Sequence, residues 1–208
     1  MENTPAMTDT TRLEARWIAD FAEHAASSEL FYNELDQKVG DGDFGTNLSQ
    51  GGSLAKQRLA ESDARPLAVM AEVFLDEIGG SSGPLFGLLF GNIERATRDG
   101  FTVETLARGV EAGRDAIVRI GHAELGDKTL IDALTPLTEA LLQAAAESRE
   151  LADALSATAA AGSEGAERTR EYRARRGRAS YVGERAIGAI DPGASAIAEL
   201  FRTAAKSC

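Results

Sequence analysis

Three aspartates stand within a stretch of eight residues, at Asp36, Asp41 and Asp43. Carboxylates held so close repel one another, so either water screens them or a cation lies between them. Glycines interleave with the aspartates and let the backbone take positive φ and approach a ligand closely. Such a loop suits Mg²⁺, a hard cation that also takes phosphate oxygens and water. The stretch indicates a magnesium site, and a solvated acidic turn stays open because Gly and Asp are ordinary turn residues.

Two familiar metal-binding motifs are similar in sequence to parts of this stretch. An EF-hand counted from Asp41 would need a bidentate Glu at its twelfth position, where the chain has Gly52. The triplet from Asp43 to Gly45 matches the metal-binding triplet of protein kinases. However, the chain has no His-Arg-Asp catalytic loop, and 208 residues are too few for two kinase lobes. Both motifs are therefore excluded.

A loop rich in glycine and serine spans residues 79–84, with the sequence Gly-Gly-Ser-Ser-Gly-Pro, and opens a helical pattern. Free N–H groups and the helix dipole make such a terminus suited to an anion, and the hydroxyls of Ser81 and Ser82 add donors. Pro84 is expected as the first residue of the helix. The alternative is a flexible turn between two helices.

A second tight turn, Gly126-Asp127-Lys128-Thr129, also precedes a helical pattern. Lys128 could face a phosphate, but the favoured interpretation is that Asp127 caps the helix and Lys128 is solvated. Asp132 and His122 are weaker candidates, and His122 is expected to be a surface residue.

Residues 168–185 hold seven arginines and only two acidic residues, in a chain of net charge −11. An arginine fork matches phosphate geometry. Most of these side chains, Arg170 among them, are expected to be solvated and to pair with acidic residues. Arg178 follows a glycine at a local turn and is the arginine predicted to reach a phosphate. An RNA-binding arm is disfavoured, because the domain is acidic and only Tyr172 and Tyr181 offer stacking.

Apolar residues recur at steps of three and four along most of the chain, as in Leu13, Trp17 and Phe21. No segment shows sustained two-residue alternation, so the sequence predicts an all-α protein with about eight helices. It also predicts one domain over residues 1–208, with residues 1–10 as a flexible tail.

Several helix boundaries are expected from local signals. Ser27 or Ser28, Thr46 and Thr102 are expected to cap helices. A helix through Phe74 is expected to stop at Gly79-Gly80, and the last helix to run from about Ala194 to Ala205. Gly162 and Gly165 are expected to be weak points in an alanine-rich helix.

The bulk composition bounds the class of protein. A hydrophobic share of 43% and a charged share of 26% are typical of a soluble globular protein. The net negative charge disfavours nonspecific binding to nucleic acid or an anionic membrane. The single cysteine, Cys208, excludes an internal disulfide. No signal-peptide core or membrane-length apolar run occurs, so a cytoplasmic protein is expected.

Together these motifs resemble the L subunit of dihydroxyacetone kinases, the nucleotide-binding, phosphoryl-transferring subunit. The resemblance covers roughly residues 10–205 and rests on five motifs in order. They are Gly40-Asp-Gly-Asp-x-Gly45, Gly79-Gly-Ser-Ser-Gly-Pro-Leu-Phe-Gly87, Gly126-Asp-Lys-Thr-Leu-Ile-Asp132, Arg175-Arg-Gly-Arg-Ala-Ser-Tyr-Val-Gly-Glu-Arg185 and Asp191-Pro-Gly-Ala194.

This resemblance implies an antiparallel eight-helix barrel with ADP or ATP at one end. Matched residue by residue, Asp36, Asp41 and Asp43 would hold Mg²⁺, as a pair of ions. The other implied nucleotide contacts are Phe44, Gly45, Thr46, Asn47, Ser81, Ser82, Gly121, Leu130, Arg178, Asp191, Pro192 and Gly193. Among them Gly121 and Leu130 would lie around the adenine, and Arg178 would act at the phosphates as the catalytic residue.

The resemblance also implies partners. A separate K subunit would hold the ketose, and a phosphohistidine protein of the sugar phosphotransferase system would recharge bound ADP. A homodimer or a transient hetero-oligomer is expected. The alternatives are a nucleotide-dependent module that binds a transcription regulator, an ATP-consuming kinase subunit and, less favoured, the nucleotide module of a fatty-acid kinase. Many family members have His where Phe44 stands, which leaves metal binding intact but puts the donor and the ketose in doubt, with a tetrulose as one candidate.

Overall fold

The computed structural model describes residues 9–176, 180 and 183–208. Over these residues the chain forms nine α-helices, two 3₁₀ helices and no strand. The α-helices are α1 (Asp9–Ser27), α2 (Glu29–Val39), α3 (Phe44–Glu61), α4 (Pro66–Asp76), α5 (Ser82–Thr97), α6 (Val103–Gly121), α7 (Ile131–Ala146), α8 (Leu151–Arg168) and α9 (Pro192–Ser207), with the 3₁₀ helices η1 (Thr169–Glu171) and η3 (Gly183–Ala186) before α9. The prediction of an all-α protein is confirmed.

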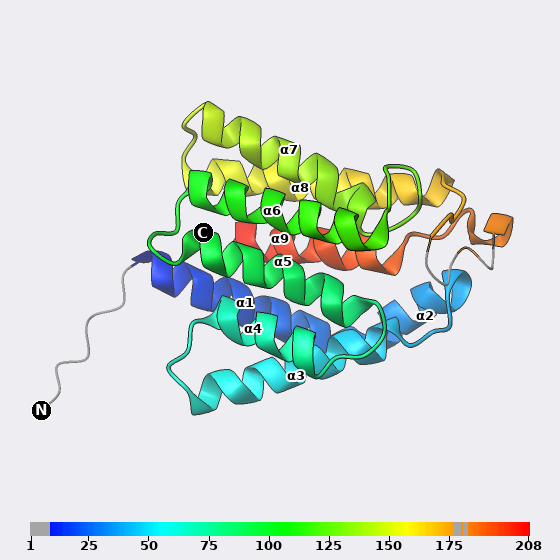
Figure 1. Ribbon diagram of the computed structural model, residues 1–208, viewed down its shortest axis with the longest axis horizontal. Helices are drawn as coiled ribbons and strands as arrows, with labels where there is room; N and C mark the ends of the chain where they lie inside the picture. The colour runs from blue at the N-terminus through cyan, green and yellow to red at the C-terminus, as the bar shows by residue number, and fades with distance from the viewer. Residues whose placement is uncertain (1–8, 177–179, 181–182) are drawn as a thin grey trace, which may run out of the picture.

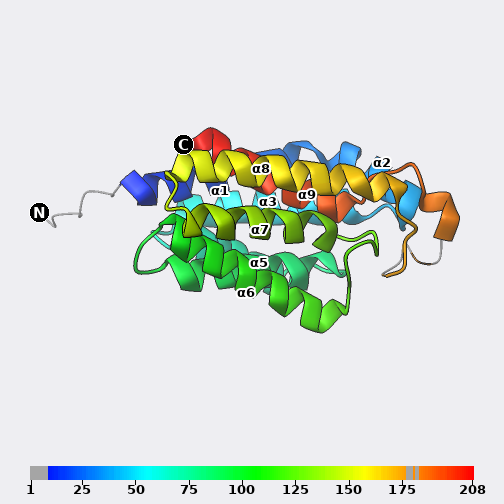
Figure 2. The ribbon, with the colours of Figure 1, turned by 90° about the horizontal axis from the view of Figure 1, so that it is seen from above.

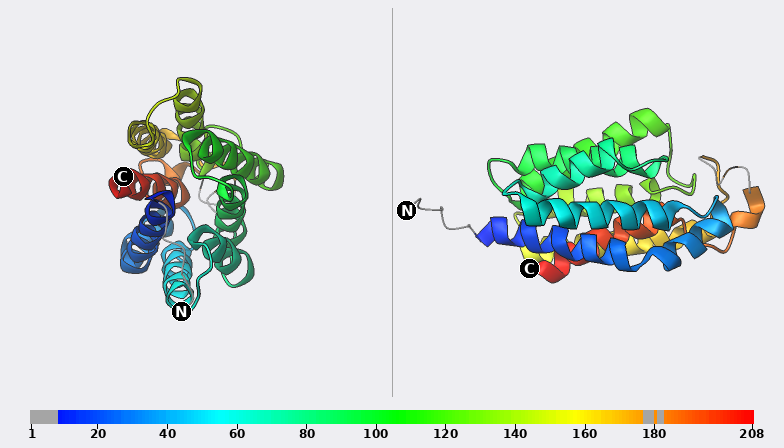
Figure 3. Two further views of the ribbon diagram at one scale, coloured as in Figure 1. Left: turned by 90° about the vertical axis from the view of Figure 1, so that its left-hand side faces the viewer. Right: turned by 90° about the horizontal axis from the view of Figure 1, so that it is seen from below.

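Eight of these helices form a closed ring in which chain neighbours pack side by side, from α1 through α3, α4, α5, α6, α7 and α8 to α9, which packs back against α1. Seen end-on, the helices surround a common axis (Figure 3). Successive helices of the ring run up and down (Figure 1), so the antiparallel eight-helix barrel is confirmed. The ninth helix, α2, is an addition to the ring and leads directly into the aspartate loop.

One apolar core fills the barrel and fixes the helices relative to one another. Trp17, Phe21, Phe74, Phe90 and Phe201 are fully buried in it. The Trp17 indole N–H donates to the Leu200 carbonyl oxygen at 2.7 Å, which satisfies its polar atom inside the core. The helices therefore form a rigid frame for the loops at either end. Of the part of the chain that the structure describes, no helix is both long and apolar enough to span a bilayer.

Because successive helices run in opposite directions, the loops between them lie alternately at the two ends of the barrel. The loops of residues 62–65, 98–102 and 147–150 lie at one end, together with the C-terminus (Figure 1). The loops of residues 40–43, 77–81 and 122–130 and the segment that joins α8 to α9 lie at the other, which we call the site end. Views from two directions place α2 and the α8–α9 connection at this same end (Figures 1 and 2). Every motif singled out in the sequence, with the exception of residues outside the described part, therefore belongs to one end of the barrel.

Helix boundaries follow the sequence signals in part. Thr102 caps α6 in a reciprocal capping box with Thr105, as expected, and Ser28 precedes α2. The expected cap at Thr46 is wrong, because α3 begins at Phe44 with Asp43 at its N-cap position. α5 begins at Ser82, so Pro84 is its third residue, and α4 ends at Asp76 before the glycines.

The last two helices also differ from expectation. Asp191 caps α9, so this helix begins at Pro192 and ends at Ser207, two residues beyond the expected range at either end. Gly162 and Gly165 are not weak points in α8. A Cβ at Gly165 would lie 2.3 Å from the Asp132 carbonyl oxygen, and one at Gly162 would lie 3.1 Å from Leu137. These glycines allow α8 to pack closely against α7.

Candidate functional site

A pocket of about 370 Å³ opens at the site end of the barrel. Its walls come from the aspartate loop, the starts of four helices, the end of α6 and the α8–α9 connection. The lining residues are Asp36, Val39, Gly40, Asp41, Asp43, Phe44, Asn47, Ser81, Ser82, Pro84, Leu85, Ile117, Ile120, Gly121, Ala123, Lys128, Thr129, Leu130, Ile131, Arg176, Asp191, Pro192 and Gly193. Residues from five separate sequence motifs thus converge on one cavity.

Asp36 is the fixed point of the acidic loop. It lies near the end of α2, is buried, and accepts hydrogen bonds at Oδ2 from the backbone N–H groups of Gly42 (2.9 Å) and Phe44 (3.2 Å). Gly42 needs its glycine because its φ is +84°. At Gly40 a Cβ would lie 2.3 Å from Asp36 Oδ1, so a larger residue there would displace the carboxylate. The loop is therefore folded around one oriented carboxylate.

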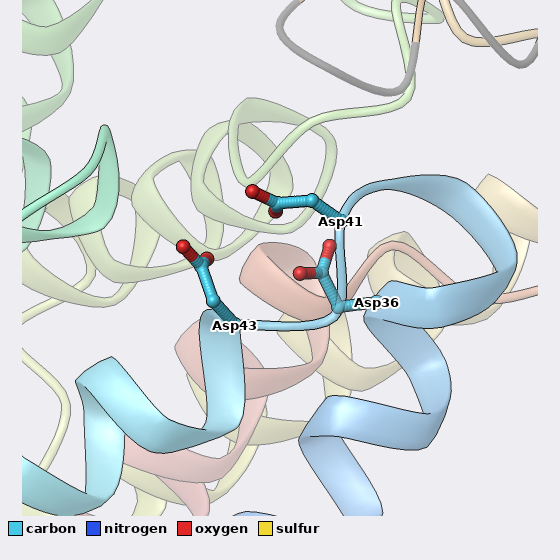
Figure 4. Close-up of side chains that lie close together, drawn as sticks. All are labelled: Asp36, Asp41 and Asp43. Atoms are coloured by element: carbon cyan, nitrogen blue, oxygen red, sulfur yellow. The ribbon is translucent and has the colours of Figure 1, made fainter.

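Asp41 and Asp43 complete an acidic cluster with Asp36. One carboxylate oxygen from each of the three lies within 4.8 Å of the others. Figure 4 shows the three side chains turned toward a shared space, from the end of α2 and from the loop that follows it. Asp41 and Asp43 are exposed, so this space is accessible from the pocket. An all-oxygen donor set of this span fits a hard divalent cation such as Mg²⁺.

Four helix N-termini contribute to the wall of the pocket. In the up-and-down ring, α3, α5, α7 and α9 all begin at the site end. Each contributes first-turn residues to the pocket wall, namely Phe44 and Asn47, Ser82 and Pro84, Ile131, and Pro192 and Gly193. The positive end of a helix dipole and unpaired backbone N–H groups favour an anion. The pocket thus combines cation-binding carboxylates with several anion-binding termini.

The remaining wall is apolar. Ile117, Ile120 and Gly121 from the end of α6 face the cavity together with Leu130, which is buried. Gly121 has open space where a Cβ would stand, so no side chain narrows the cavity at that point. Such a surface suits a planar aromatic ring rather than a charged group.

The turn before α7 differs from the sequence interpretation. Lys128 is not solvated: it is 1% exposed, and its ammonium donates to the carbonyl oxygens of Thr169 and Ala189. Asp127 does not cap α7 either. It is buried, and its Oδ2 accepts from the Glu124 N–H at 3.0 Å. Sequence reasoning missed this arrangement, since a lysine in a polar turn gives no signal of burial.

Two buried aspartates, one in the pocket wall and one outside it, lie near the start of α7 and of α9. Asp132 accepts from the N–H groups of Gly126 (2.6 Å) and Thr129 (2.8 Å), so it shapes the turn and does not line the cavity. Asp191 lines the cavity and caps α9 by accepting from the Ala194 N–H at 2.8 Å. Burial raises the pKa of Asp132, and burial together with the nearby charge of Asp132 raises the pKa of Asp191 to about 7.

Burial lowers the pKa of the Lys128 ammonium, against the charges of Asp191 and Asp132, which raise it. Of the pocket walls that the structure describes, Lys128 and Arg176 are the only cationic residues, against four aspartates. The site end therefore carries an excess of carboxylates that a bound cation would offset.

Most of the residues expected to contact a nucleotide meet in this pocket. Gly45 and Thr46 do not line it. A Cβ at Gly45 would lie 2.1 Å from the Glu29 carbonyl oxygen, and Thr46 bonds with Glu29 and Asn33 of α2. These two residues pack α3 against α2 and so support the acidic loop from behind. Their assignment as nucleotide contacts gains no support from this geometry.

The arginine predicted to act at the phosphates, Arg178, lies outside the described residues. Arg176, two positions earlier, lines the pocket, and its Nε donates to Asp127 Oδ2 at 3.2 Å. Arg170 is exposed, but it is more than a solvated charge, because it pairs with Glu167 and also donates to the Gly188 carbonyl oxygen at 3.1 Å. The sequence placed the arginines in one cluster but did not single out Arg176.

The fold and the site together define an all-α barrel protein with a ligand pocket and a candidate cation site at one end. Residues 38–206 match the model of the DAK2 domain, and the chain belongs to this family. It is 36% identical over 192 residues to the PEP-dependent dihydroxyacetone kinase 1, ADP-binding subunit DhaL, of Listeria innocua, with 89% of this chain and 91% of that protein covered. It is 33% identical over 187 residues to the corresponding ADP-binding subunit DhaL of Escherichia coli K12, with 87% of this chain and 89% of that protein covered.

A solved structure of a dihydroxyacetone kinase is also similar to this chain. The dihydroxyacetone kinase of C. freundii in complex with AMP-PNP and Mg²⁺ superposes with a TM-score of 0.70 at 28% identity. The comparison covers 100% of this chain and 35% of that one, so the chain spans about a third of the length of the C. freundii kinase. The L-erythrulose 1-kinase of Mycolicibacterium smegmatis is 34% identical over 194 residues, which is 89% of this chain and 34% of that protein.

Proposed function

We propose that this protein is the ADP-binding subunit of a dihydroxyacetone kinase, a phosphotransferase that acts together with partner subunits. It holds a magnesium–nucleotide complex at the site end and passes a phosphoryl group to a ketose bound on a separate K subunit. One observation carries the proposal: the three-aspartate cluster belongs to a pocket lined by the starts of four helices and by an apolar wall. These are the three kinds of surface that a cation, a diphosphate and a base require.

The acidic cluster is the proposed metal site. Asp36, Asp41 and Asp43 supply the carboxylate oxygens, and a pair of Mg²⁺ ions is proposed. These carboxylates would hold Mg²⁺, whose positive charge would neutralise the charge that develops on the phosphates. Within this chain, the N–H groups of Gly42 and Phe44 fix the orientation of Asp36 before any ligand enters.

The other pocket residues hold the nucleotide. Asn47, Ser81 and Ser82 donate to the phosphates from the starts of α3 and α5. Gly121 and Leu130 lie against the adenine, and Asp191 to Gly193 close the wall at the start of α9. Phosphoryl transfer needs positioning and charge neutralisation rather than a covalent side chain, so a frame of fixed donors can perform it. Arg178 is proposed as the catalytic arginine, and Arg176 contributes positive charge to the described pocket wall.

Phe44 makes the phosphate end of the pocket less polar than a histidine would. Its ring lies edge-on to Tyr32 with ring centroids 5.7 Å apart, and it is tilted against the ring of Phe86 with centroids 6.4 Å apart. These contacts anchor the start of α3 to the core. Phenylalanine cannot donate to a phosphate, so the proposed site relies on backbone N–H groups and hydroxyls there. A tetrulose in place of dihydroxyacetone remains the second candidate ketose, supported by the similarity to the L-erythrulose 1-kinase.

The surface around the pocket supports partner docking at this end. The exposed large apolar side chains of the described residues are Leu30, Phe31, Leu75, Ile120, Leu125 and Ile187. All of them lie on α2, on the ends of α4 and α6, or in the site-end loops. Exposed apolar side chains gathered at one end are typical of a protein interaction surface. A K subunit that presents its ketose to the pocket would cover them.

Bound ADP is proposed to act as a prosthetic group that a phosphohistidine protein recharges. The aspartate cluster offers three carboxylates to one metal–nucleotide complex, which slows ADP release. Slow release suits a subunit that is recharged in place and disfavours one that must exchange ADP for ATP at each turnover.

The test is to purify the protein, desalt it in the presence of Mg²⁺, denature it and assay the released ADP. The native protein is then given a K subunit and dihydroxyacetone, with either ATP alone or a phosphohistidine donor. The proposal expects retained ADP and sustained transfer only with the phosphohistidine donor. Many turnovers on ATP alone, with no ADP retained, would make it an ATP-consuming kinase subunit. The same assay with L-erythrulose as acceptor distinguishes the two ketoses.

A further inference from the structure

Lys128 stands out among the charged residues of the site end. It is the only lysine or arginine that is buried among the residues the structure describes. Its backbone lies in the left-handed region, with φ of 62°, which is uncommon for a residue other than glycine. A buried cation in an uncommon conformation needs partners that compensate for the loss of water.

The partners of Lys128 are two backbone carbonyl oxygens from distant points of the chain. Its ammonium donates to Thr169, at the end of α8, and to Ala189 at 2.5 Å, just before α9. These two residues lie near the two ends of the connection between α8 and α9, whose described residues, 169–176, 180 and 183–191, we call the α8–α9 segment. One ammonium group therefore ties together the two ends of this segment at the mouth of the barrel.

Further bonds close the base of the α8–α9 segment around the same point. The Asp191 N–H donates to Thr169 Oγ1 at 2.9 Å, and the Gly188 N–H donates to the Arg170 carbonyl oxygen at 2.7 Å. The residue before the lysine binds the first part of the segment, because the Asp127 carbonyl oxygen accepts from the Arg175 N–H at 3.0 Å. The dipeptide Asp127-Lys128 thus forms hydrogen bonds with the α8–α9 segment near both of its ends and at Arg175.

The α8–α9 segment forms part of the pocket wall. Arg176, Asp191 and Lys128 all line the pocket. Arg176 directly follows Arg175, whose N–H is bound by Asp127, so its position depends on that hydrogen bond. The position of Asp191 depends on the contacts that Lys128 makes with Thr169 and Ala189. An apolar side chain at position 128 would remove the ammonium donor from the Ala189 carbonyl oxygen and would leave the Thr169 carbonyl oxygen with the Tyr172 N–H, so the two ends of the segment would no longer be joined by one side chain.

We infer that Lys128 is a positioning residue, which fixes the α8–α9 segment so that Arg176 and Asp191 are in place before a ligand binds. The inference rests on the proposed nucleotide site for its effect on binding, but the anchoring itself does not depend on any ligand. Lys128 acts through backbone carbonyl oxygens rather than by touching a phosphate.

Amide hydrogen exchange in the ligand-free protein tests the anchoring, with Lys128→Met compared with wild type. The reporters are the N–H groups of Arg175, Gly188 and Asp191. The reference is the Leu106 N–H at the opposite end, which donates to Thr102. We expect exchange at the reporters to be at least about tenfold faster, with no change at the reference, because local opening follows the local hydrogen bonds. Lys56→Met, an exposed lysine paired with Glu23 in the barrel wall, should change neither.

Affinity for ADP with Mg²⁺ is measured on the same variants and should fall at least about tenfold for Lys128→Met, since preorganisation of the wall is lost. Lys128→Gln keeps an amide that can donate to one carbonyl oxygen. It should give intermediate exchange and affinity, and it carries the test if Lys128→Met does not fold.

Unchanged exchange at the reporters in a folded variant would overturn the inference, as would equal acceleration at Leu106, which would mean a merely structural role. Faster exchange at the reporters with unchanged affinity would overturn the link to the pocket. If wild type itself fails to bind ADP with Mg²⁺ while the reporters respond as expected, the proposed function fails and the anchoring stands.

Discussion

The two ends of the barrel are built from the same helices and differ in almost every local property. At the far end, short loops are closed by ordinary means. Arg65 pairs with the buried Glu14 at 2.6 Å and with Glu94 at 3.3 Å, and the Thr102 capping box starts α6. At the site end, buried carboxylates and one buried ammonium hold the loops, two of which are longer than any at the far end. The far end therefore serves the stability of the fold, and the site end serves the pocket.

Backbone conformation shows the same difference. Among the residues the structure describes, every residue with positive φ other than Ser148 lies at the site end. Charge is also uneven, since Asp36, Asp127, Asp132 and Asp191 are buried there with Lys128 as the only buried cation in the described chain. Functional sites commonly carry such uncompensated charge and unusual backbone conformations. Without a bound cation the site end should therefore be the less stable half, and a bound cation should stabilise it.

Removal of a proposed metal ligand should give the largest effect. Loss of an outer hydrogen-bond partner of a ligand costs roughly 10- to 100-fold in metal affinity. Asp43→Asn removes a ligand itself, so it should weaken Mg²⁺-dependent ADP binding and phosphoryl transfer by more than about 100-fold. The melting temperature of the ligand-free protein should stay the same or rise, because one repelling charge is gone. The matched control is Asp63→Asn, an exposed aspartate of the far-end loop, which should bind ADP as wild type does; an equal loss in both variants would contradict the comparison of the two ends.

Breaking the ion pair at the far end should do the reverse. Arg65→Met leaves Glu14 buried without its cation, and breaking a buried pair from one side costs roughly 3–5 kcal/mol. Because Arg65 is partly exposed, we expect a loss of about 3 kcal/mol in the free energy of unfolding. Denaturant titration measures the loss, and calorimetry should find unchanged ADP affinity. A large fall in affinity at an unchanged unfolding midpoint would show that the ends are not separate in function.

The pH dependence of Asp191→Asn should expose the charge excess of the site end. The folded-state pKa of Asp191 is raised from 3.8 to about 7, so the stability contributed by its protonated carboxyl is complete below pH 3.8 and is lost as pH rises through 7. Asparagine caps a helix about as well as aspartate and does not ionise. In a metal-free buffer, the variant's gain in unfolding free energy should grow between about pH 4 and pH 7, reach at least about 1 kcal/mol, and then stay constant. A gain independent of pH would contradict the assignment.

A glycine substitution should give the smallest effect. Gly165→Ala places a Cβ against the Asp132 carbonyl oxygen at the start of α7, and overpacking costs about 1–3 kcal/mol. Gly91→Ala is the matched control in α5, because its Cβ would meet only Ala71 at 3.6 Å. There the better helix propensity of alanine should add up to about 1 kcal/mol. Thermal unfolding of both variants checks the opposite signs, and a loss in both would mean that helix packing does not distinguish them.

Helical periodicity was sufficient for the all-α class and residue spacing for the acidic loop, and the reasons are local, whereas the closed barrel followed only from the resemblance to the L subunit of dihydroxyacetone kinases. Helical periodicity and caps such as Thr102 act over a few residues, and Asp36, Asp41 and Asp43 lie close together in the chain. The single-domain assignment, the oligomeric state and the residue roles at the nucleotide stay predictions.

The contacts that the sequence could not reveal are long-range. Lys128 bonds to carbonyl oxygens 41 and 61 residues further along the chain, and burial of a lysine in a polar turn leaves no periodic signal. The close packing of Gly165 against α7 has the same origin, because a glycine in a helix reads as weak unless its neighbour is known. The placement of Thr46 against α2 rather than at a helix start also depends on a partner 17 residues earlier.

The central claim is that the site end binds nucleotide through a cation held by the acidic cluster, and titration calorimetry of ADP tests it most directly. Wild-type protein, stripped of bound nucleotide, is titrated with ADP in buffer containing Mg²⁺ and in the same buffer with a chelator instead. We predict tight binding with Mg²⁺ and at least about 100-fold weaker binding without it, because the carboxylates and phosphates repel one another unless a cation separates them. Equal affinity in the two buffers, or no binding in either, would contradict the account.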